Sequence, residues 1–266
     1  MARILITSVP TRQYLDPVRY LTNASSGRTG KAIAEAALAF GHEVVIVSGP
    51  VAVEYPVACL VRAVVTTEEM LDACRAEFPT CDGLIGAAAP CDYRPIQVAS
   101  SKITKTGAPL ELRLVETADV VATLGAEKLP HQWLVGFALE TDDRHFRAVT
   151  KMQKKSCDLM VLNGPSAIDS LDNTVELLDR SGTVVATIEG AKGEVATSIL
   201  NWVQRLLISN MYREPRASKA SASLLPMRRP RYVTMYSRFL YGFVAKRPSP
   251  VAERPMRYGR LDTLRI

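Results

Sequence analysis

An apolar strand, a glycine-containing loop, a helix and a second apolar strand follow one another within the first fifty residues. Ile4–Ser8 is a short run rich in β-branched residues, apolar side chains recur at helical spacing from Gly30 to Phe40, and Glu43–Pro50 is the next apolar run. Gly41 ends the helix. Two strands joined in this way form a βαβ unit with a right-handed crossover and parallel strands. The opening therefore predicts a parallel sheet.

The alternation continues to about residue 208. We expect strands at Cys59–Val65, Gly83–Ala89, Leu110–Val115, Gln132–Leu139 and Asp158–Gly164, and helices at Thr67–Phe78, from the cap Thr117, at Arg144–Cys157 and at Glu194–Ile208. Asn173–Leu178 and Thr183–Ile188 flank Arg180-Ser181-Gly182, which indicates a hairpin. Near-continuous apolar strands are typical of a sheet that is covered on both faces. The prediction is an α/β fold with a doubly wound, mostly parallel Rossmann-like sheet and a late antiparallel hairpin.

The net charge of +6 is unevenly distributed. Residues 212–266 hold 13 Lys and Arg against 3 Asp and Glu, which leaves 20 against 24 in residues 1–211. We therefore predict a mildly acidic domain over residues 1–211 and a basic, disordered extension over residues 212–266. Arginines interleaved with aromatic residues in that extension could bind RNA, but such a pattern is weak evidence, and we do not favour a nucleic-acid partner.

The five cysteines include no Cys-x-x-Cys pair, so structural zinc and a disulfide framework are not expected. The apolar run after Met1-Ala2-Arg3 is too short for a signal peptide, and no later run reaches membrane-spanning length. We therefore predict a cytoplasmic protein with no membrane partner.

The loop Arg19–Gly30 has the composition of an anion-binding site. Its small residues let the backbone approach a ligand, Ser25 and Ser26 offer hydroxyl groups, and the helix after Gly27 directs unpaired N–H groups at the loop. Asn23 adds an uncharged amide that both donates and accepts hydrogen bonds. The alternative is that Asn23 and Ser25 only cap the helix.

Two further stretches are candidates for the same site. Ala87-Ala88-Ala89 leave room at the carboxyl end of a strand, where open α/β sheets bind ligands, and Asp92 follows at once. The aperiodic loop Pro95–Gly107 carries Lys102 and Lys105, which could shield negative charge over a phosphate. The alternatives are that the alanines only make room for a helix and that the lysines are solvated surface residues.

On the expected helix Arg144–Cys157, Lys151 and Lys155 are four residues apart and share a face. The two lysines either lie on a solvent-exposed face or bind a nucleotide as a second point of contact.

Six ordered blocks together resemble one known family. They are Asp16–Tyr20 with Asn23–Gly27, Val47–Pro50, Ala88–Pro95, Lys102–Lys105, Val135–Thr141 and Lys151–Asn163. In order and spacing they resemble phosphopantothenate-cysteine ligase, the synthetase half of the bacterial coenzyme A flavoprotein, over about residues 3–208. Because the flavin-binding decarboxylase half is not present upstream, the resemblance implies a stand-alone ligase without flavin, with a separate decarboxylase as a partner.

The resemblance implies a reaction in which a nucleoside triphosphate and Mg²⁺ activate the carboxylate of 4′-phosphopantothenate as an acyl-nucleotide, before the amine of cysteine displaces the nucleotide. It assigns catalytic roles to Asn23, which would hold the acyl intermediate, and to Lys102 and Lys105, which would screen the two anions. Asp92-Tyr93-Arg94 looks like the bacterial branch, which prefers CTP, with ATP as the alternative.

The remaining site residues also follow from the resemblance. It implies nucleotide contacts at Ser25, Gly27, Gly86, Ala87, Ala88, Asp92, Lys102, Thr117, Ala118, Asp119, Val120, Phe137, Lys151 and Lys155. It implies contacts with the acid substrate at Asn23, Ser26 and Arg19, and it assigns no metal ligands. It also implies a homodimer in which the late hairpin and the lysine-bearing loop help complete the neighbour's site.

The chain departs from the family pattern at three places. Val9-Pro10-Thr11 replaces the usual Gly-Gly-Thr, Gln13 replaces a Glu, and Thr104 stands where the middle of three lysines is usual. These departures keep open a second hypothesis, a nucleotide-binding paralogue without catalysis. A third, an NAD(P)-dependent reductase, needs Gly-x-Gly-x-x-Gly after the first strand, where this chain has Ser8-Val9-Pro10.

Overall fold

The computed structural model describes residues 1–140, 142–164 and 172–209. The predicted basic extension at residues 212–266 lies outside the described residues, so its disorder stays a prediction.

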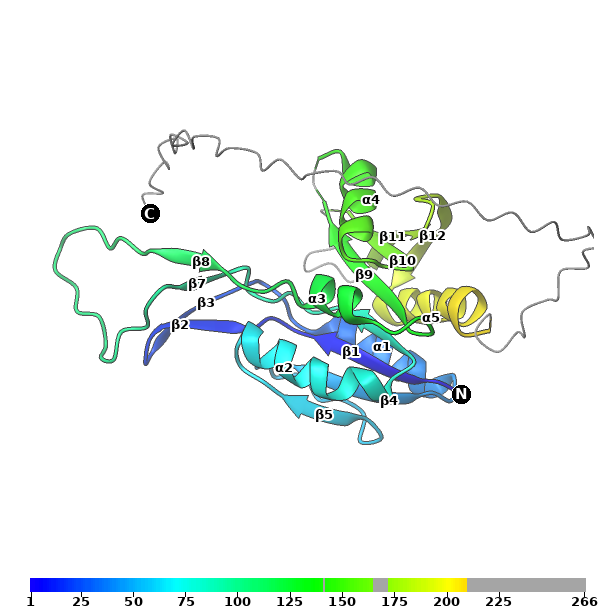
Figure 1. The fold of residues 1–266 in the computed structure, drawn as a ribbon, viewed down its shortest axis with the longest axis horizontal. Helices are drawn as coiled ribbons and strands as arrows, with labels where there is room; N and C mark the ends of the chain where they lie inside the picture. Colours follow the sequence, from blue (N-terminus) through cyan, green and yellow to red (C-terminus); the bar gives the residue numbers. More distant parts are fainter. Residues whose placement is uncertain (141, 165–171, 210–266) are drawn as a thin grey trace, which may run out of the picture. The chain divides into compact units, whose positions relative to one another are not determined.

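The predicted doubly wound sheet is confirmed. Eight strands lie in the order β12-β11-β10-β9-β6-β1-β4-β5 (Figure 1). They are β1 (Arg3–Ser8), β4 (Glu43–Ser48), β5 (Leu60–Ala63), β6 (Gly83–Gly86), β9 (Trp133–Leu139), β10 (Leu159–Asn163), β11 (Asp172–Asp179) and β12 (Val184–Ala191). The first six are parallel, while β11 and β12 form the late antiparallel hairpin. β1 pairs with β4 on one side and β6 on the other, so the switch point of the sheet lies beside β1.

Helices cover both faces of the sheet. α1 (Arg28–Ala39) and α5 (Lys192–Val203) pack on one face, and α2 (Thr67–Glu77), α3 (Val120–Glu127) and α4 (Arg144–Lys154) pack on the other. Alternate residues of each strand supply the two cores: Ile4 and Ile6 of β1 face α1 and α5, whereas Leu5 faces α2 and α3. Burial on both faces explains why the strands read as continuous apolar runs.

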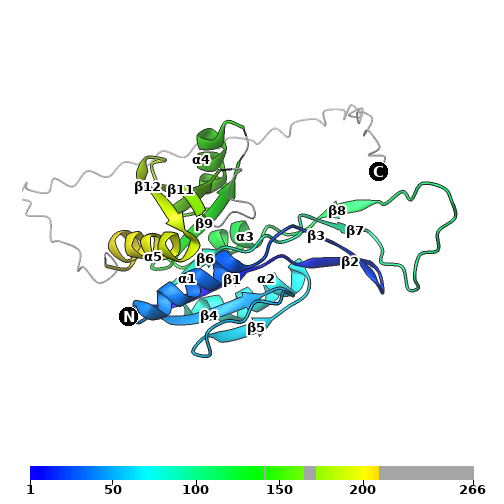
Figure 2. The same ribbon diagram turned by 180° about the vertical axis from the view of Figure 1, so that it is seen from behind.

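Two small antiparallel hairpins form an arm that the sequence did not predict. β2 (Arg12–Asp16) pairs with β3 (Arg19–Thr22), and β7 (Tyr93–Pro95) pairs with β8 (Leu114–Glu116). Both hairpins extend away from the main sheet, with β2 beside β7, and residues 96–113, hereafter the flap, connect β7 to β8 (Figures 1 and 2). The expected strand Leu110–Val115 is thus shorter and belongs to the arm.

The arm was missed for a physical reason. Its strands are three to five residues long and pair only with one another, so they leave no long hydrophobic period in the sequence. The signal that was available is Asp16-Pro17 between two runs containing aromatic residues, which is a turn between strands.

Candidate functional site

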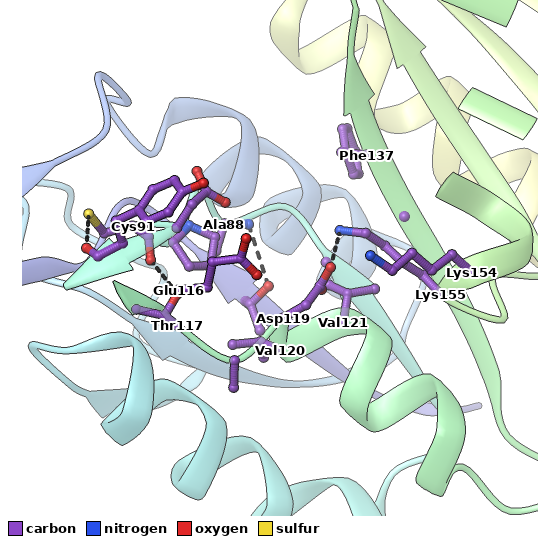
Figure 3. Close-up of a pocket in the computed structure, with 17 residues that line it drawn as sticks. Ala88, Cys91, Glu116, Thr117, Asp119, Val120, Val121, Phe137, Lys154 and Lys155 are labelled. Carbon is purple, nitrogen blue, oxygen red and sulfur yellow. Dashed lines mark hydrogen bonds and ion pairs between the residues drawn. The ribbon is translucent and has the colours of Figure 1, made fainter. Parts of the chain in front are cut away.

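A cavity of about 420 Å³ opens at the carboxyl ends of the central strands. Thr7 of β1, Gly86 of β6, and Gly136 and Phe137 of β9 contribute its floor and one wall. The turn Pro90–Tyr93 and the segment Glu116–Val121, which leads into α3, contribute the other walls (Figure 3). This is the edge at which open α/β sheets bind ligands.

Many of the residues that the sequence predicted for nucleotide binding come together here. Those that line the cavity are Gly86, Ala88, Asp92, Thr117, Ala118, Asp119, Val120, Phe137 and Lys155. They come from four separate elements of the chain, and Figure 3 shows Phe137 and Lys155 on the side opposite Ala88 and Thr117. The cavity therefore gathers residues that are up to seventy positions apart in the sequence.

Asp119 and Lys155 link two helix ends at this cavity. Asp119 Oδ1 accepts a hydrogen bond from the backbone N–H of Ala122 at 3.0 Å, and its Oδ2 lies 3.1 Å from Lys155 Nζ. Asp119 is therefore the N-cap of α3, and the expectation that Thr117 caps this helix is wrong. Asp119 caps the helix in place of Thr117 because Asp119 lies one residue before the helix, where its side-chain oxygen reaches the first free N–H groups.

Lys151 and Lys155, which were expected to act together, make different contacts. Lys151 pairs with the buried carboxylate of Glu140 and does not line the cavity. Lys155 is the C-cap residue of α4 and does line it, together with its neighbour Lys154. Lys154 was missed, because sequence spacing alone does not show which side chains at a fraying helix end turn toward a ligand.

Asn23 lies outside the cavity lining but is tied to its wall. Its amide nitrogen donates a hydrogen bond to the carbonyl oxygen of Pro90 at 2.8 Å and approaches that of Ala89 at 3.4 Å. The N-cap of α1 is Gly27, at φ +76°, and no side chain caps that helix. The alternative in which Asn23 and Ser25 only cap the helix is therefore wrong, and the first N–H groups of α1 are left for another acceptor.

The other predicted residues lie elsewhere. Ser25, Ser26 and Gly27 form the turn before α1, Ala87 packs against the core, and Lys102 and Lys105 are exposed on the flap. Arg19, on the β2–β3 hairpin, contacts the flap through the carbonyl oxygen of Ile103 at 3.0 Å. None of these residues lines the cavity, so the described chain brings together only part of the predicted site.

Comparison with known proteins shows the family of the chain. Residues 1–207 match the model of the DNA/pantothenate metabolism flavoprotein C-terminal domain. The chain belongs to this family. The resemblance inferred from the six sequence blocks is thereby confirmed.

One relative of the chain is a bifunctional protein about twice as long as the matched region. The chain is 38% identical over 210 residues to the coenzyme A biosynthesis bifunctional protein CoaBC of Vibrio vulnificus. The aligned region covers 77% of this chain and 52% of that protein. The chain thus spans about half the length of the curated relatives it matches.

Two solved structures have the same fold. The C-terminal domain of a coenzyme A biosynthesis bifunctional protein CoaBC has a TM-score of 0.65 at 36% identity, covering 78% of this chain and 96% of that domain. A Cab2 H337A mutant in complex with phosphopantothenate-cysteine has a TM-score of 0.61 at 14% identity, covering 78% of this chain and 88% of that one. At that identity the second likeness shows the fold alone.

Val9 stands where the family pattern has a glycine, and its backbone adopts a conformation that glycine favours. Val9 adopts a φ of +67°, a region that β-branched residues rarely enter. Its side chain is fully buried and fills the space in front of Gly27, where an added Cβ would lie 2.2 Å from Val9 Cγ1. The turn after β1 therefore has the positive φ that a glycine would supply, now held by packing.

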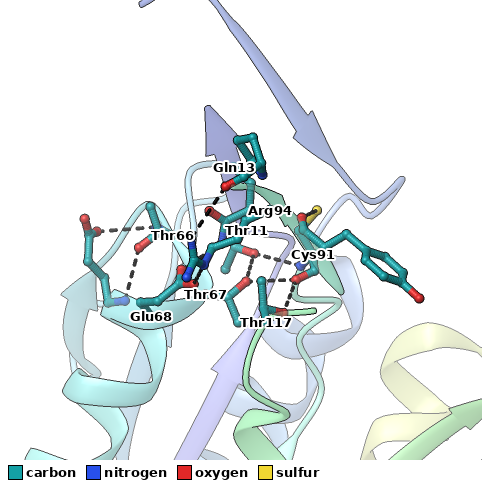
Figure 4. Close-up of polar contacts among 11 residues, drawn as sticks. Thr11, Gln13, Thr66, Thr67, Glu68, Cys91, Arg94 and Thr117 are labelled. Atoms are coloured by element: carbon teal, nitrogen blue, oxygen red, sulfur yellow. Dashed lines mark hydrogen bonds and ion pairs between the residues drawn. The ribbon is translucent and has the colours of Figure 1, made fainter. Parts of the chain in front are cut away.

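Three threonines hold the cavity turn in place, and two of them, Thr11 and Thr67, were missed by the sequence reasoning. The Cys91 carbonyl oxygen accepts hydrogen bonds from Thr117 Oγ1 at 2.7 Å and Thr67 Oγ1 at 3.1 Å, and the Cys91 N–H donates to Thr11 Oγ1 at 2.8 Å. The hydroxyl groups of Thr11 and Thr67 are also 2.8 Å apart (Figure 4). The network fixes the peptide between the two cavity residues Pro90 and Asp92.

The thiol of Cys91 lines the cavity in its neutral form. Burial raises the pKa of the Cys91 thiol above its ordinary value, and Sγ donates to the carbonyl oxygen of Tyr93 at 3.2 Å. Because thiolate is the nucleophilic form, Cys91 is not arranged as a nucleophile.

The described residues contain neither a cluster of metal-ligating side chains nor a membrane-spanning helix. Among them, no three His, Cys, Asp or Glu side chains lie close enough together to hold a metal ion. None of the helices in that part of the chain has the length and hydropathy needed to cross a membrane.

Proposed function

We propose that this protein is a phosphopantothenate-cysteine ligase, which joins 4′-phosphopantothenate and L-cysteine in coenzyme A biosynthesis. The observation that carries the proposal is the cavity at the switch point, with Asp119 and Lys155 at one side and the Asn23-bound turn at the other. The name of the Vibrio vulnificus relative and the ligand in the Cab2 complex support this choice of pathway and substrate.

The cavity is the proposed site of the nucleotide, which we take to be CTP. Lys154 and Lys155 supply positive charge on one side, and small residues such as Gly86 and Ala88 leave room for a flat base. The uncapped first turn of α1, with Ser25 and Ser26 before it, is the proposed site of the phosphate of 4′-phosphopantothenate.

The proposed reaction has two steps. A carboxylate oxygen of 4′-phosphopantothenate forms a bond to the α-phosphorus of CTP, and pyrophosphate leaves. The cysteine amine then forms a bond to the acyl carbon, CMP leaves with the electron pair of the broken C–O bond, and the amine proton passes to solvent. Asn23, held against Pro90, would donate a hydrogen bond to the acyl oxygen during the second step.

Lys102 and Lys105 would screen the two anions that meet in the first step. They are exposed on a flap that extends away from the main sheet of the same chain (Figure 1). The arm also exposes apolar side chains, including Val18, Tyr93, Ile96 and Val98. Such a surface is typical of an interface between chains, and we propose a homodimer in which each flap helps complete the neighbour's site.

Magnesium would enter with the nucleotide. Because the described side chains form no protein-only metal site, Mg²⁺ would be held mainly by the triphosphate, with Asp92, Glu116 or Asp119 of the cavity as the available carboxylates. Its charge would favour departure of pyrophosphate. A cytoplasmic location and a separate decarboxylase that supplies the next step remain predictions.

The test is release of pyrophosphate from purified protein supplied with 4′-phosphopantothenate, cysteine and Mg²⁺, run in parallel with CTP and ATP. We expect turnover with CTP and its loss in Lys102→Ala, while Arg75→Ala, on the exposed surface of α2, keeps wild-type turnover. Binding of CTP by calorimetry without pyrophosphate release would favour the paralogue without catalysis, for which Val9 and Thr104 are the motivating departures. No CTP binding at all would overturn the proposal.

A further inference from the structure

The carboxylate of Asp16 lies at the turn of the β2–β3 hairpin and accepts four hydrogen bonds. Oδ1 accepts from the backbone N–H groups of Val18 at 2.8 Å and Arg19 at 2.9 Å. Oδ2 accepts from Arg19 Nη1 at 2.5 Å and from the backbone N–H of Ile103 at 3.1 Å. The Asp16 side chain is 0% exposed, so these partners replace water completely.

One of these bonds reaches across 87 residues of chain to the flap. Arg19 Nη1 in turn donates to the carbonyl oxygen of Ile103 at 3.0 Å. The Asp16–Arg19 ion pair therefore holds both main-chain polar groups of Ile103. A second link lies nearby, where the Ala99 N–H donates to the carbonyl oxygen of Leu15 at 2.9 Å.

The charge state of Asp16 suits this arrangement. Burial alone would raise the pKa of its carboxyl group, but the N–H groups of Val18, Ile103 and Arg19 and the charge of Arg19 together lower the pKa below its usual value. Asp16 is therefore ionised at neutral pH, and its hydrogen bonds to the flap are charge-assisted.

We infer that Asp16 is a positioning residue that sets the place of the flap lysines. Lys102 directly precedes Ile103 and Lys105 follows it by two residues, so pinning the Ile103 peptide fixes the backbone on which both amines are carried. The inference deepens the proposed function and rests on it for its catalytic consequence. That Asp16 anchors the flap follows from the hydrogen bonds to Ile103 and does not depend on the proposed function.

The same ion pair couples the flap to the loop that leads into α1. Arg19 begins β3, and Asn23 follows the end of that strand. One carboxylate thus connects the strand before Asn23 with the loop that carries Lys102. Because misplacing a catalytic group by about 1 Å costs roughly a hundredfold in rate, such an anchor has a catalytic consequence without touching substrate.

Asp16→Asn tests the anchor with almost no change of shape. The remaining oxygen still accepts from Val18 and Arg19, whereas the NH₂ group that replaces Oδ2 is unable to accept from Ile103. We expect hydrogen exchange over residues 99–106 to become at least about tenfold faster, with unchanged exchange in β1 and β4. This readout needs no substrate and no activity.

The catalytic consequence is tested with the same variant in the pyrophosphate assay. We expect kcat to fall by about ten- to a hundredfold with the KM for CTP within about twofold, because the cavity is the proposed site that holds CTP, whereas the flap lysines act on the two anions as they react. In a background with both Lys102→Ala and Lys105→Ala, Asp16→Asn should lower any residual rate no further, since its effect passes through those two lysines. A merely structural role would lower both backgrounds alike.

Asp179→Asn is the matched control for exchange. Asp179 also lies at a hairpin turn and accepts from the backbone N–H groups of Ser181 and Thr183, at 2.9 and 3.1 Å, but makes no contact with the flap. Its replacement should leave exchange over residues 99–106 unchanged. For activity, the control is Glu127→Gln, which changes an exposed carboxylate in the pair with Arg75.

The outcomes separate the inference from the proposed function. Faster flap exchange with no pyrophosphate release by the wild type supports the anchor and overturns the ligase. Unchanged flap exchange in Asp16→Asn overturns the anchor, whatever the activity. If Asp16→Asn does not fold, Arg19→Gln, which removes the bond to the Ile103 carbonyl oxygen, must give the faster exchange instead.

Discussion

Lys155 Nζ lies 3.1 Å from Asp119 Oδ2, which joins the C-cap of α4 to the N-cap of α3 at the mouth of the cavity. The two helices also meet directly, because Gly125 of α3 packs against the backbone of Lys155. The position of the Lys155 amine is therefore set by how closely α3 approaches the end of α4.

This relationship predicts different effects for two lysines that share a helix. Lys155→Ala should weaken binding of CTP by about tenfold or more, because an amine that faces bound phosphate is worth at least about 1.4 kcal/mol. Lys151→Ala should change it by less than about threefold, since Lys151 is paired with Glu140 away from the cavity. Isothermal titration calorimetry measures the affinity of each variant for CTP. Equal losses of affinity in the two variants would contradict the placement of Lys155, but not Lys151, at the nucleotide.

Gly125→Ala should damage both folding and binding. An added Cβ would lie 2.0 Å from the Lys155 carbonyl oxygen, so α3 and α4 must separate. We expect the free energy of unfolding to fall by about 1–3 kcal/mol and the affinity for CTP to fall with it.

The control for this variant is Gly193→Ala in α5, where an added Cβ meets nothing within 4 Å. Because Gly193 lies in the first turn of α5, where the advantage of alanine is smaller than in a helix interior, the change should stabilise the protein by less than about 1 kcal/mol. Chemical denaturation measures both variants, and a neutral Gly125→Ala would show that the helix contact is not close.

Thr67→Val should loosen the turn that carries Cys91. Valine has the shape of threonine but leaves the Cys91 carbonyl oxygen and the Thr11 hydroxyl with one partner fewer in a buried setting. The expected loss in the free energy of unfolding is about 1–3 kcal/mol. Thr67→Ser keeps the hydroxyl group and should recover most of it, and failure of serine to do so would assign the loss to packing.

Stability should depend on pH through His42. Burial lowers the pKa of His42 below 6.5, and its Nδ1 accepts a hydrogen bond from the Ala2 N–H at 3.2 Å. Because the unfolded chain binds the proton more readily, this stabilisation is complete above about pH 6.5 and is lost as the pH falls toward the folded-state pKa.

The measurement is urea denaturation from about pH 7 to about pH 5, where the free energy of unfolding should decrease. In His42→Asn, whose amide oxygen can replace Nδ1 as acceptor, this decrease should be smaller. An equal slope in the wild type and His42→Asn would exclude His42 as the titrating group.

The main sheet could be predicted because its signals are local. Ile4–Ser8 and Glu43–Ser48 are buried runs on either side of a helix whose end is followed by Gly41, and Gly182, at φ +82°, marks the turn of the late hairpin. The arm could not be predicted in the same way, because its short strands are fixed by contacts such as Asp16 to Ile103, far apart in sequence.

The site was predictable in part for a related reason. The position of Asp119 beside the cavity followed from the family pattern, but its pairing with Lys155 depends on how two helices pack. Thr11 and Thr67 gave no signal, since an isolated threonine near a strand or helix end is ordinary, and only the fold shows that both hydroxyl groups reach the Cys91 peptide.

The buried side chain of Val9 has a consequence for how this sequence can change. Since its methyl group occupies the space that a side chain at position 27 would need, the two positions cannot vary independently. Any mutational route that gives position 27 a side chain must first shorten residue 9. Directed evolution of the loop before α1 should therefore begin from a glycine at position 9, where both the backbone angle and the space are free.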